Sequence, residues 1–367
     1  MKYKLKELLT IHNGKDYRQQ HKGIIPVYGT GGVMTHIDAY LYTGESILLP
    51  RKGSLSNIMY VNGPFWTVDT IYWTTVNTHL VNAKYLYYYL SLLDLSSRDT
   101  GSALPSMTYN SYYELDIDLP SLSVQQKIAQ SIDNIDQKIA INNTISKELE
   151  SMAKTIYDYW FLQFEFPDKD GKPYRSNGGK MIWNDQLKQN IPKGWKVKRL
   201  GDYAEIQKGK LLTAKETNLN GSYKVVSAGL DYSYHHDQFN NLENTITISA
   251  SGANAGFVRL WYEKIYANDC TTVRGNSVNE TDYIFNFLKS AQDYLYQQAR
   301  GSAQPHVYPK DIENIKIVIP PENIMNRFSM NNFNDRIALI VKENQQLKSL
   351  RDFLLPMLMN GQVTIKD

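Results

Sequence analysis

The chain lacks several features that would assign it to a familiar class of protein. Its 367 residues contain one cysteine, Cys270, so no internal disulfide can form and a reducing, cytoplasmic setting is expected. No apolar run is long enough to span a membrane, and no signal peptide opens the chain. The net charge of +3 argues against a strongly basic, non-specific nucleic-acid binder, but it allows local basic patches.

Motifs for common catalytic chemistry are also missing. Gly178-Gly179-Lys180-Met181 lacks the spacing and the hydroxyl residue of a nucleoside-triphosphate loop. No Gly-rich strand-to-helix turn is present for a dinucleotide or a methyl donor. His235 and His236 are adjacent rather than at ligand spacing, and Asp269-Cys270 has no nearby partner in the sequence. We therefore predict no catalytic residue, no metal site and no cofactor, and a structural role for Cys270.

What the chain does contain is an internal repeat, together with an unusually large number of tyrosines, 27. Three matched pairs of segments carry the repeat: Tyr3–Leu8 with Trp195–Leu200, Gly101–Pro105 with Gly301–Pro305, and Leu119-Pro120 with Ile319-Pro320. A long helical pattern follows each copy. Such a duplication predicts a pseudo-two-fold molecule, and duplex DNA is the commonest target with a matching dyad.

Each copy is predicted to be a mixed α/β module. Short β-rich runs alternate with Gly, Asn and Pro turns, and one apolar helix lies near the end of each copy. Asp69 corresponds to Asp269, and Arg51-Lys52 to Ala250-Ser251. The predicted strands are 24–28, 47–49, 58–61, 70–74 and 115–119 in the first copy, and 224–226, 245–249, 257–261 and 315–319 in the second. The predicted helices are 83–93 and 282–296.

The helices that follow the modules show a heptad pattern of apolar residues with one phase shift in each. The pattern comprises Ile128, Ile132, Ile135, Ile139, Ile145, Leu149, Met152 and Ile156 in the first, and Met330, Phe333, Ile337, Ile340, Leu347, Leu350 and Leu354 in the second. Each helix is about 50 Å long at 1.5 Å per residue, longer than a compact domain needs. We expect the two to pack antiparallel with a module at each end; the alternative is two amphipathic helices on their own modules. The predicted segments are a module at 1–120, a helix at 121–164, a polar linker at 165–194, a module at 195–320 and a helix at 321–362.

The candidate DNA contacts lie in loops of the two modules. Arg and Lys can read guanine or clamp phosphates, Asn and Gln can read adenine, and hydroxyls suit phosphates. For any single residue a solvated loop is the alternative. The candidates are Lys15, Tyr17, Arg18, Gln19, Arg51, Lys52, Ser54, Ser102, Ser106 and Tyr109 in the first module, and Lys208, Lys210, His235, His236, Ser251, Asn254, Arg274, Arg300, Ser302, Gln304, His306 and Tyr308 in the second.

A cluster of aromatic residues ends the first long helix. Tyr157, Tyr159, Trp160 and Phe161 exceed what one helix end must bury. We expect part of this cluster to form a docking surface for a partner protein, with a local core as the alternative.

Four stretches of the chain resemble the specificity subunit of type I restriction–modification enzymes, and the resemblance covers nearly the whole sequence. They are Asn190–Tyr203, Gln125–Ile139, Tyr159–Glu165 and Leu358–Gly361. The second helix departs from the pattern, because Asn323–Phe328 stands where Ser123–Ile128 stands in the first, two residues shorter between Pro320 and Ser329.

The resemblance implies a non-catalytic subunit with two target-recognition domains, 1–120 and 195–320, each reading half of a bipartite double-stranded DNA site. It implies that two methyltransferase subunits dock on the helices and that restriction subunits join them. S-adenosylmethionine, Mg²⁺ and ATP would belong to those partners. Three hypotheses compete with this one: a coiled-coil scaffold without DNA recognition, a stand-alone DNA-binding protein without a restriction role, and an enzyme with an unrecognised site. The recognised DNA sequence cannot be deduced from the chain.

Overall fold

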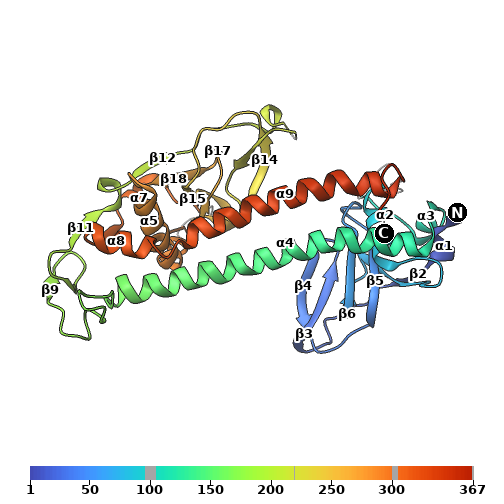
Figure 1. Ribbon diagram of the computed structural model, residues 1–367, viewed down its shortest axis with the longest axis horizontal. Helices are drawn as coiled ribbons and strands as arrows, with labels where there is room; N and C mark the ends of the chain where they lie inside the picture. The colour runs from blue at the N-terminus through green and yellow to red at the C-terminus, as the bar shows by residue number, and fades with distance from the viewer. Residues whose placement is uncertain (96–104, 219, 300–304, 366–367) are drawn as a thin grey trace. The chain divides into compact units, whose positions relative to one another are not determined.

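The computed structural model describes residues 1–95, 105–218, 220–299 and 305–365. The chain forms two compact units (Figure 1). Unit 1 comprises Met1–Ile141 and Gln345–Asp367, and unit 2 comprises Asn142–Asn344. The five segment boundaries predicted from the sequence stay a prediction.

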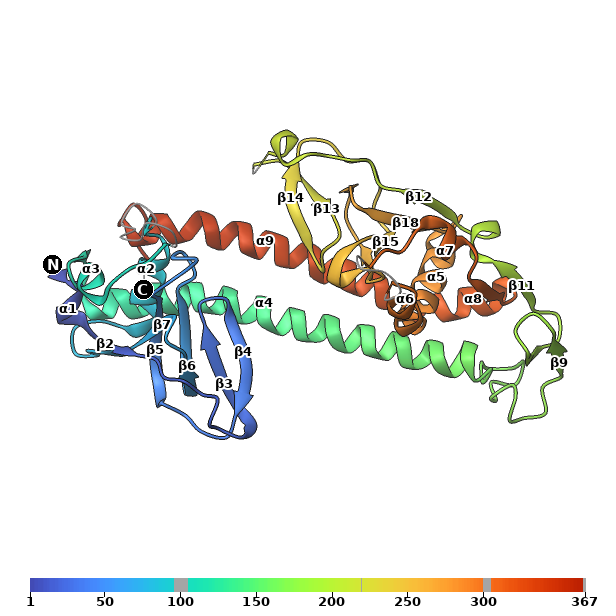
Figure 2. The same cartoon turned by 180° about the vertical axis from the view of Figure 1, so that it is seen from behind.

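Unit 1 contains a sheet of six strands in the order β2-β7-β5-β6-β3-β4 (Figure 2). All neighbours are antiparallel except β3 and β6, which run parallel. Apolar and aromatic residues are frequent along these strands, and β5 and β6 end in continuous buried runs, which places those strand ends inside the core. The strands are β2 (Leu9–Asn13), β3 (Lys22–Gly29), β4 (Gly32–Ile37), β5 (Tyr42–Pro50), β6 (Met59–Thr67) and β7 (Ile71–Val76).

Short elements close unit 1. Asn82 caps the N-terminus of α2 by accepting a hydrogen bond from the backbone N–H of Tyr85, and α2 packs on β5 and β6 through Tyr85, Leu86 and Leu90. The N-terminal strand β1 pairs antiparallel with β8, so that Tyr3 lies opposite Ile117. These elements are β1 (Lys2–Lys4), α1 (Leu5–Leu8), α2 (Ala83–Ser91), α3 (Tyr109–Tyr113) and β8 (Asp116–Asp118).

Unit 2 contains a sheet of order β12-β18-β15-β16 and a second of order β14-β13-β17. Helix α5 covers β15, β16 and β18. The strands are β11 (Lys196–Arg199), β12 (Glu205–Lys208), β13 (Tyr223–Val226), β14 (Tyr232–His236), β15 (Thr245–Ser249), β16 (Val258–Trp261), β17 (Ile265–Ala267), β18 (Cys270–Arg274) and β19 (Lys316–Ile319). The helices are η3 (Leu200–Asp202), η4 (Ala214–Glu216), η5 (Gly252–Asn254), α5 (Val278–Ser290), α6 (Gln292–Ala299) and α7 (Pro309–Glu313).

The linker 165–194 contains regular structure that the sequence analysis did not predict. A hairpin of β9 (Met181–Asn184) and β10 (Gln189–Pro192) lies within it, and Phe166 and Ile191 are buried in the core of unit 2. The π-helix η2 (Asp158–Leu162) precedes the linker. The polar composition of the segment therefore conceals a small folded element.

The two modules share one strand order, except that β6 of unit 1 corresponds to two strands of unit 2, β16 and β17. The order β2-β7-β5-β6-β3-β4 in unit 1 corresponds to β12-β18-β15-β16/β17-β13-β14 in unit 2. The parallel pair recurs as well, because β3 pairs with β6 and β13 with β17. The terminal pairs β1–β8 and β11–β19 also match. The predicted duplication and the mixed α/β fold class are therefore confirmed.

The long helices are α4 (Leu122–Tyr157) and α9 (Phe333–Met359), and their segments pack antiparallel within each unit. In unit 1, Ile128 and Ile132 of α4 share a core with Leu358 and Leu355 of α9. In unit 2, Asn142 of α4 donates a hydrogen bond from Nδ2 to Oδ1 of Asn344, at 2.9 Å. The predicted helix pairing is therefore present in each unit.

The seam between these helices differs from the predicted one. Asn142 and Asn344 are buried and continue the spacing of three and four, so no phase shift occurs. Polar side chains therefore fill positions where an apolar pattern shows a break. Four predicted seam residues are exposed instead: Ile145, Met152, Met330 and Leu350.

The second long helix is also interrupted. A short helix, α8 (Glu322–Ser329), ends before α9 begins, and Asn332 between them has a left-handed backbone with φ of 53°. Asparagine tolerates this conformation better than most residues. The expectation of one helix over 321–362 is therefore wrong at this point.

Candidate nucleic-acid interface

In unit 1 the loop after β5 is tied to two other segments. The backbone N–H groups of Arg51 and Lys52 both donate to the carbonyl of Thr70, and Lys52 forms a β-bridge with Ser106. The N–H of Met107 donates to the carbonyl of Arg51, at 3.0 Å. Three predicted contact residues from segments more than 50 positions apart therefore lie at one edge of the module.

An open groove of about 900 Å³ lies beside this loop. It is lined by Tyr17, Arg18 and Lys52, by the hairpin tip Gly29–Gly31 and by the turn Val68–Thr70. The Arg18 guanidinium makes two-pronged hydrogen bonds to Asp16, which lower the pKa of that carboxyl to about 2. Asp16 therefore stays ionised and holds Arg18 at the mouth of the groove.

The remaining candidates of unit 1 surround the same edge. The Arg51 guanidinium lies over the Tyr72 ring, 5.9 Å from its centroid, and the Tyr109 ring meets Tyr72 edge-on. Lys15, Gln19 and Ser54 are exposed on the adjoining loops. The predicted DNA-contact residues of the first module that the structure describes therefore lie at one end of its sheet.

The corresponding edge of unit 2 has the same backbone geometry with different side chains. Ser251 forms a β-bridge with His306, and the N–H of Val307 donates to the carbonyl of Ala250. The Ser251 hydroxyl donates to the Asp269 carboxylate at 2.6 Å. The predicted correspondence of Arg51-Lys52 with Ala250-Ser251 is therefore present in the hydrogen bonds.

Several other predicted residues of unit 2 lie at this edge. The rings of His306 and Tyr308 stack with centroids 5.9 Å apart, and Asn254 ends the short helix that follows Ser251. Lys208 and Lys210 are exposed where β12 ends. This edge therefore presents imidazole, hydroxyl and amide groups beside its lysines.

Three predicted residues of unit 2 lie elsewhere. Arg274 is at the far end of β18 from the turn that contains Asp269, and it pairs with Glu205 in the sheet register. His235 and His236 lie on β14, and the Nδ1 atom of His236 is buried without a hydrogen-bond partner among the residues that the structure describes. Ser102, Arg300, Ser302 and Gln304, which were also predicted, lie outside the described residues.

The aromatic end of α4 is mostly core. Tyr157 and Phe161 are 1% and 3% exposed and pack against Tyr283 and Phe328 of unit 2. Trp160 is half-buried against Phe328, whereas Tyr159 is 40% exposed. Tyr157 and Phe161 cannot present their rings to a partner, so the docking prediction rests on Tyr159 and Trp160.

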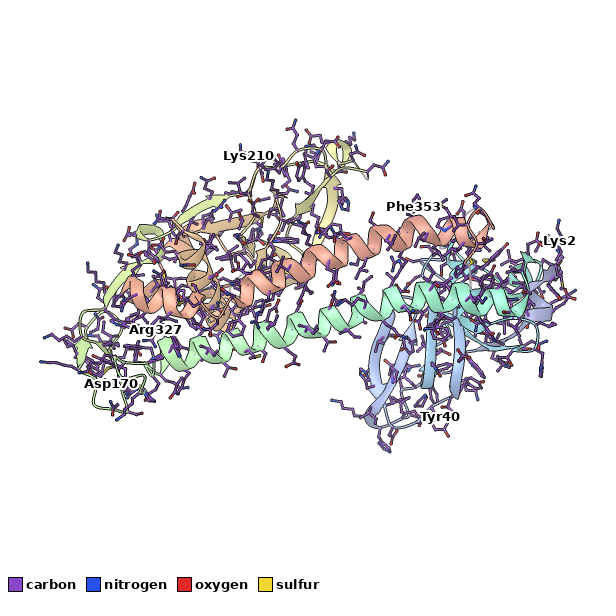
Figure 3. All side chains as sticks on the ribbon, viewed as in Figure 1. Lys2, Tyr40, Asp170, Lys210, Arg327 and Phe353 are labelled. Atoms are coloured by element: carbon purple, nitrogen blue, oxygen red, sulfur yellow. The ribbon has the colours of Figure 1, made fainter. Side chains whose placement is uncertain are left out.

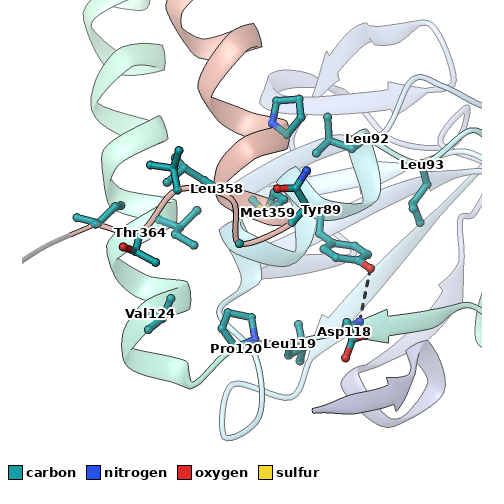
Figure 4. A pocket seen from close by; sticks show the side chains of 16 residues that line it. Tyr89, Leu92, Leu93, Asp118, Leu119, Pro120, Val124, Leu358, Met359 and Thr364 are labelled. Carbon is teal, nitrogen blue, oxygen red and sulfur yellow. Dashed lines mark hydrogen bonds between the residues drawn. The ribbon is translucent and has the colours of Figure 1, made fainter.

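An apolar pocket of about 850 Å³ in unit 1 contains none of the predicted contact residues (Figure 4). It lies between α2, the start of α4 and the end of α9, and Tyr89, Leu92 and Met359 line it. The tail segment Val363–Ile365 of the same chain forms part of its wall. The hydroxyl of Tyr89 accepts a hydrogen bond from the N–H of Asp118 beside it.

The described ranges of the chain contain no group of three or more His, Cys, Asp or Glu side chains that could hold a metal ion. Burial raises the pKa of the Cys270 thiol to about 12, which makes the thiolate inaccessible near neutral pH. No helix in the described part of the chain is long and apolar enough to cross a membrane.

Some residues at the two edges were not predicted as contacts. Thr30 lies between the glycines of the β3–β4 hairpin tip, and its hydroxyl donates to the carbonyl of Thr70. Asp69 lines the groove of unit 1, and its counterpart Asp269 accepts from Ser251. Two features of the sequence could have pointed to these residues: the glycine-rich segment Gly29–Gly32, and the recurrence of Asp69 as Asp269.

The chain matches a known protein family. The family described as "Type I restriction modification DNA specificity domain" matches residues 1–151 and 192–349. The MjaIX specificity subunit of Methanocaldococcus jannaschii is 25% identical over 356 residues, covering 89% of this chain and 79% of the relative. The HindI specificity subunit of Haemophilus influenzae is 22% identical over 415 residues, covering 87% of this chain and 88% of the relative.

A solved structure shares the fold. The crystal structure of the type I restriction–modification S subunit from M. genitalium matches with a TM-score of 0.59 and 16% identity, covering 98% of this chain and 95% of that one. The named relatives are specificity subunits, whose part in their systems is not catalytic. The chain belongs to the type I restriction–modification DNA specificity family, and it is a specificity subunit rather than an enzyme.

Proposed function

We propose that the chain reads an asymmetric, bipartite double-stranded DNA target, with one half-site for each module. The observation that carries this proposal is the repeat itself. One backbone arrangement occurs at the ends of β5 and β15, and it holds different side chains in the two copies. A shared scaffold with variable loop chemistry suits two related but distinct recognition tasks.

The side chains at these edges have the chemistry that base and phosphate contacts need. Lys52 provides a cation, and Arg18 a guanidinium paired with Asp16, in a groove whose glycine-rich wall allows close approach of a nucleic-acid backbone. His306 and Asn254 provide an imidazole and an amide in unit 2. Because the two edges differ, the two half-sites are expected to differ in sequence.

The proposed target has an unread stretch between its halves. Helix α4, which follows the first module, has 36 residues and is about 54 Å long at 1.5 Å per residue, whereas one DNA turn is roughly 34 Å. We therefore propose a spacer of about 5–8 base pairs.

We further propose that two methyltransferase subunits bind along α4 and α9, with Tyr159 and Trp160 in the contact. Exposed aromatic rings contribute strongly to protein interfaces. Restriction subunits would join this assembly in the full complex. The methyl donor, Mg²⁺ and ATP would be bound by those partners, so the chain itself needs no cofactor.

Methylome sequencing of a host that expresses the chain with its methyltransferase tests the proposal. We expect a methylated motif of two unequal halves around a fixed gap. Exchange of residues 195–320 for the domain of another family member should change one half and leave the other intact. A methylated motif that is a continuous palindrome, or a domain exchange that alters both halves, would contradict the proposal of a bipartite target.

Two results would favour the competing hypotheses. A complex that binds all DNA sequences alike would support a scaffold without recognition. DNA methylation by the purified chain with methyl donor alone would support an enzyme with an unrecognised site.

A further inference from the structure

One position at the two edges is the same in both copies down to its backbone contacts. A Cβ atom added to Gly14 would lie 2.0 Å from the carbonyl oxygen of Val68, and one added to Gly209 would lie 2.0 Å from that of Asn268. Both contacts are with backbone, which cannot give way as a flexible side chain can. Only glycine therefore fits at either position.

A lysine follows each of these glycines and is held in the same way. The N–H of Lys15 donates to the carbonyl of Thr67 at 2.8 Å, and that of Lys210 donates to the carbonyl of Ala267 at 3.0 Å. The sheet registers agree with this match, because the residue two positions before each lysine pairs with the second residue of β7 or of β18. Three independent features thus make Lys15 and Lys210 equivalent.

The side chains of both lysines reach solvent. Each is exposed, and neither forms an ion pair within the part of the chain that the structure describes. Figure 3 shows Lys210 on the outer side of the module of unit 2, away from α8 and α9. The loops diverge directly afterwards, with Asp16-Tyr17-Arg18 in one copy and Leu211-Leu212-Thr213 in the other.

Both glycine–lysine pairs lie close to the module edges that hold Lys52 in unit 1 and Ser251 in unit 2. Gly14 and Gly209 contact the turns Val68–Thr70 and Asn268-Asp269. The first turn lines the groove together with Lys52. In the second turn, the Asp269 carboxylate accepts a hydrogen bond from the hydroxyl of Ser251. The backbone of each lysine therefore lies beside the turn that adjoins Lys52 in one copy and Ser251 in the other.

We propose that Lys15 and Lys210 are a matched pair of phosphate clamps, while the neighbouring unlike residues, Lys52 and Ser251, contribute the sequence preference. This inference rests on the proposed DNA-recognition function. Two half-sites of different sequence have only their sugar–phosphate backbone in common, so a side chain that is repeated at both is suited to that shared part. Lysine is a mobile point charge, which fits a phosphate better than a directional base contact.

The test compares Lys15→Ala and Lys210→Ala in the assembled complex with methyltransferase, on the target duplex and on duplexes with single base changes. Each variant should weaken binding roughly three- to tenfold at low salt, equally on every duplex. Each should reduce the slope of log affinity against log salt by about 0.9. Lys22→Ala and Lys193→Ala, which change exposed lysines elsewhere in units 1 and 2, serve as controls.

Two outcomes would overturn the inference alone. The first is that a variant matches its control in affinity and salt slope while the wild-type complex keeps its motif. The second is that a variant changes preference at one base position rather than binding overall. A wild-type complex with no sequence preference would instead overturn the proposed function, and the inference with it.

Discussion

The two modules make opposite electrostatic contacts at equivalent junctions with the long helices. In unit 1, the Lys84 ammonium of α2 lies 2.5 Å from an Asp133 carboxylate oxygen of α4. In unit 2, the corresponding position on α5 is Asp282, which hydrogen-bonds Asn334 and lies near Asp335 of α9. Lys84 and Asp282 correspond because each lies two residues before a fully buried apolar residue, Leu86 in α2 and Ile284 in α5. An ion pair in one copy is thus replaced by two acids in the other.

At the second junction a buried acid with a raised pKa takes the place of the ion pair. Asp282 is buried, and one of its carboxyl oxygens has no partner in the described residues. Burial, aided by Asp335, raises the pKa of Asp282 from 3.8 to about 7, although the hydrogen bond with Asn334 opposes the rise. Apolar packing therefore maintains the fold that the two modules share. The charge of a side chain at the junction can differ between the copies without altering that fold.

The largest expected effect concerns Ile135 and Ile337, which occupy matching positions in the two helices. Ile337 is 2% exposed, whereas Ile135 is half-buried. Ile337→Asp should lower the free energy of unfolding by about 3–5 kcal/mol, because it buries an unpaired charge. Ile135→Asp should cost less, about 1–3 kcal/mol. Urea unfolding followed by circular dichroism measures both losses. Equal losses of unfolding free energy would show that the two positions in the seam are energetically alike.

The next effect is a pH dependence at the acidic junction. Below about pH 4, Asp282 is protonated in both the folded and the unfolded chain. Between about pH 4 and 7 the unfolded chain loses the proton while the folded chain retains it, so the free energy of unfolding falls as pH rises. Asp282→Asn should remove this decline and stabilise the chain at pH 8 by roughly 2–4 kcal/mol.

The matched change at the other junction is Lys84→Met. It should not reproduce the pH profile of Asp282→Asn, because it removes an ion pair instead of a buried acid. Urea unfolding at pH 4.5, 6 and 8 measures both variants. Parallel pH profiles for wild type and Asp282→Asn would show that Asp282 ionises normally in the folded chain.

A smaller effect should follow from exchanging the two recognition edges. Lys52→Ser and Ser251→Lys make each edge resemble the other at one position. Each variant should change the preference at one base pair of one half-site by about 1–3 kcal/mol. Methylome sequencing reads the result. A shift in both half-sites from a single exchange would mean that the edges do not act separately.

The smallest effect is expected at the aromatic end of α4. Tyr159→Ser and Trp160→Ala should each weaken methyltransferase binding by about 1 kcal/mol or more, because exposed rings are lost from the contact. Titration calorimetry with the purified methyltransferase measures this, and Tyr40→Ser, at an exposed position in unit 1 outside the two long helices, is the control. Unchanged binding by both folded variants would contradict a docking role for the cluster.

Sequence by itself determined the duplication, the module composition and most of the helix pairing. Matched segments such as Leu119-Pro120 and Ile319-Pro320 mark equivalent boundaries, because proline favours the starts of helices and disrupts their interiors. Ile128, Ile132, Ile139 and Ile337 lie in the seam as their spacing predicts. These features are local or periodic, and such features can be read along a chain.

Tertiary structure alone decided which loop residues meet and which polar groups are buried. The equivalence of Lys15 with Lys210 depends on strand pairing between residues more than 50 positions apart, which no local pattern contains. Hydrophobic periodicity also misses Asn142 and Asn344, because their burial depends on the hydrogen bond that each finds in the opposite helix. A polar residue reveals its place only when its partner is known, and that partner comes from the fold.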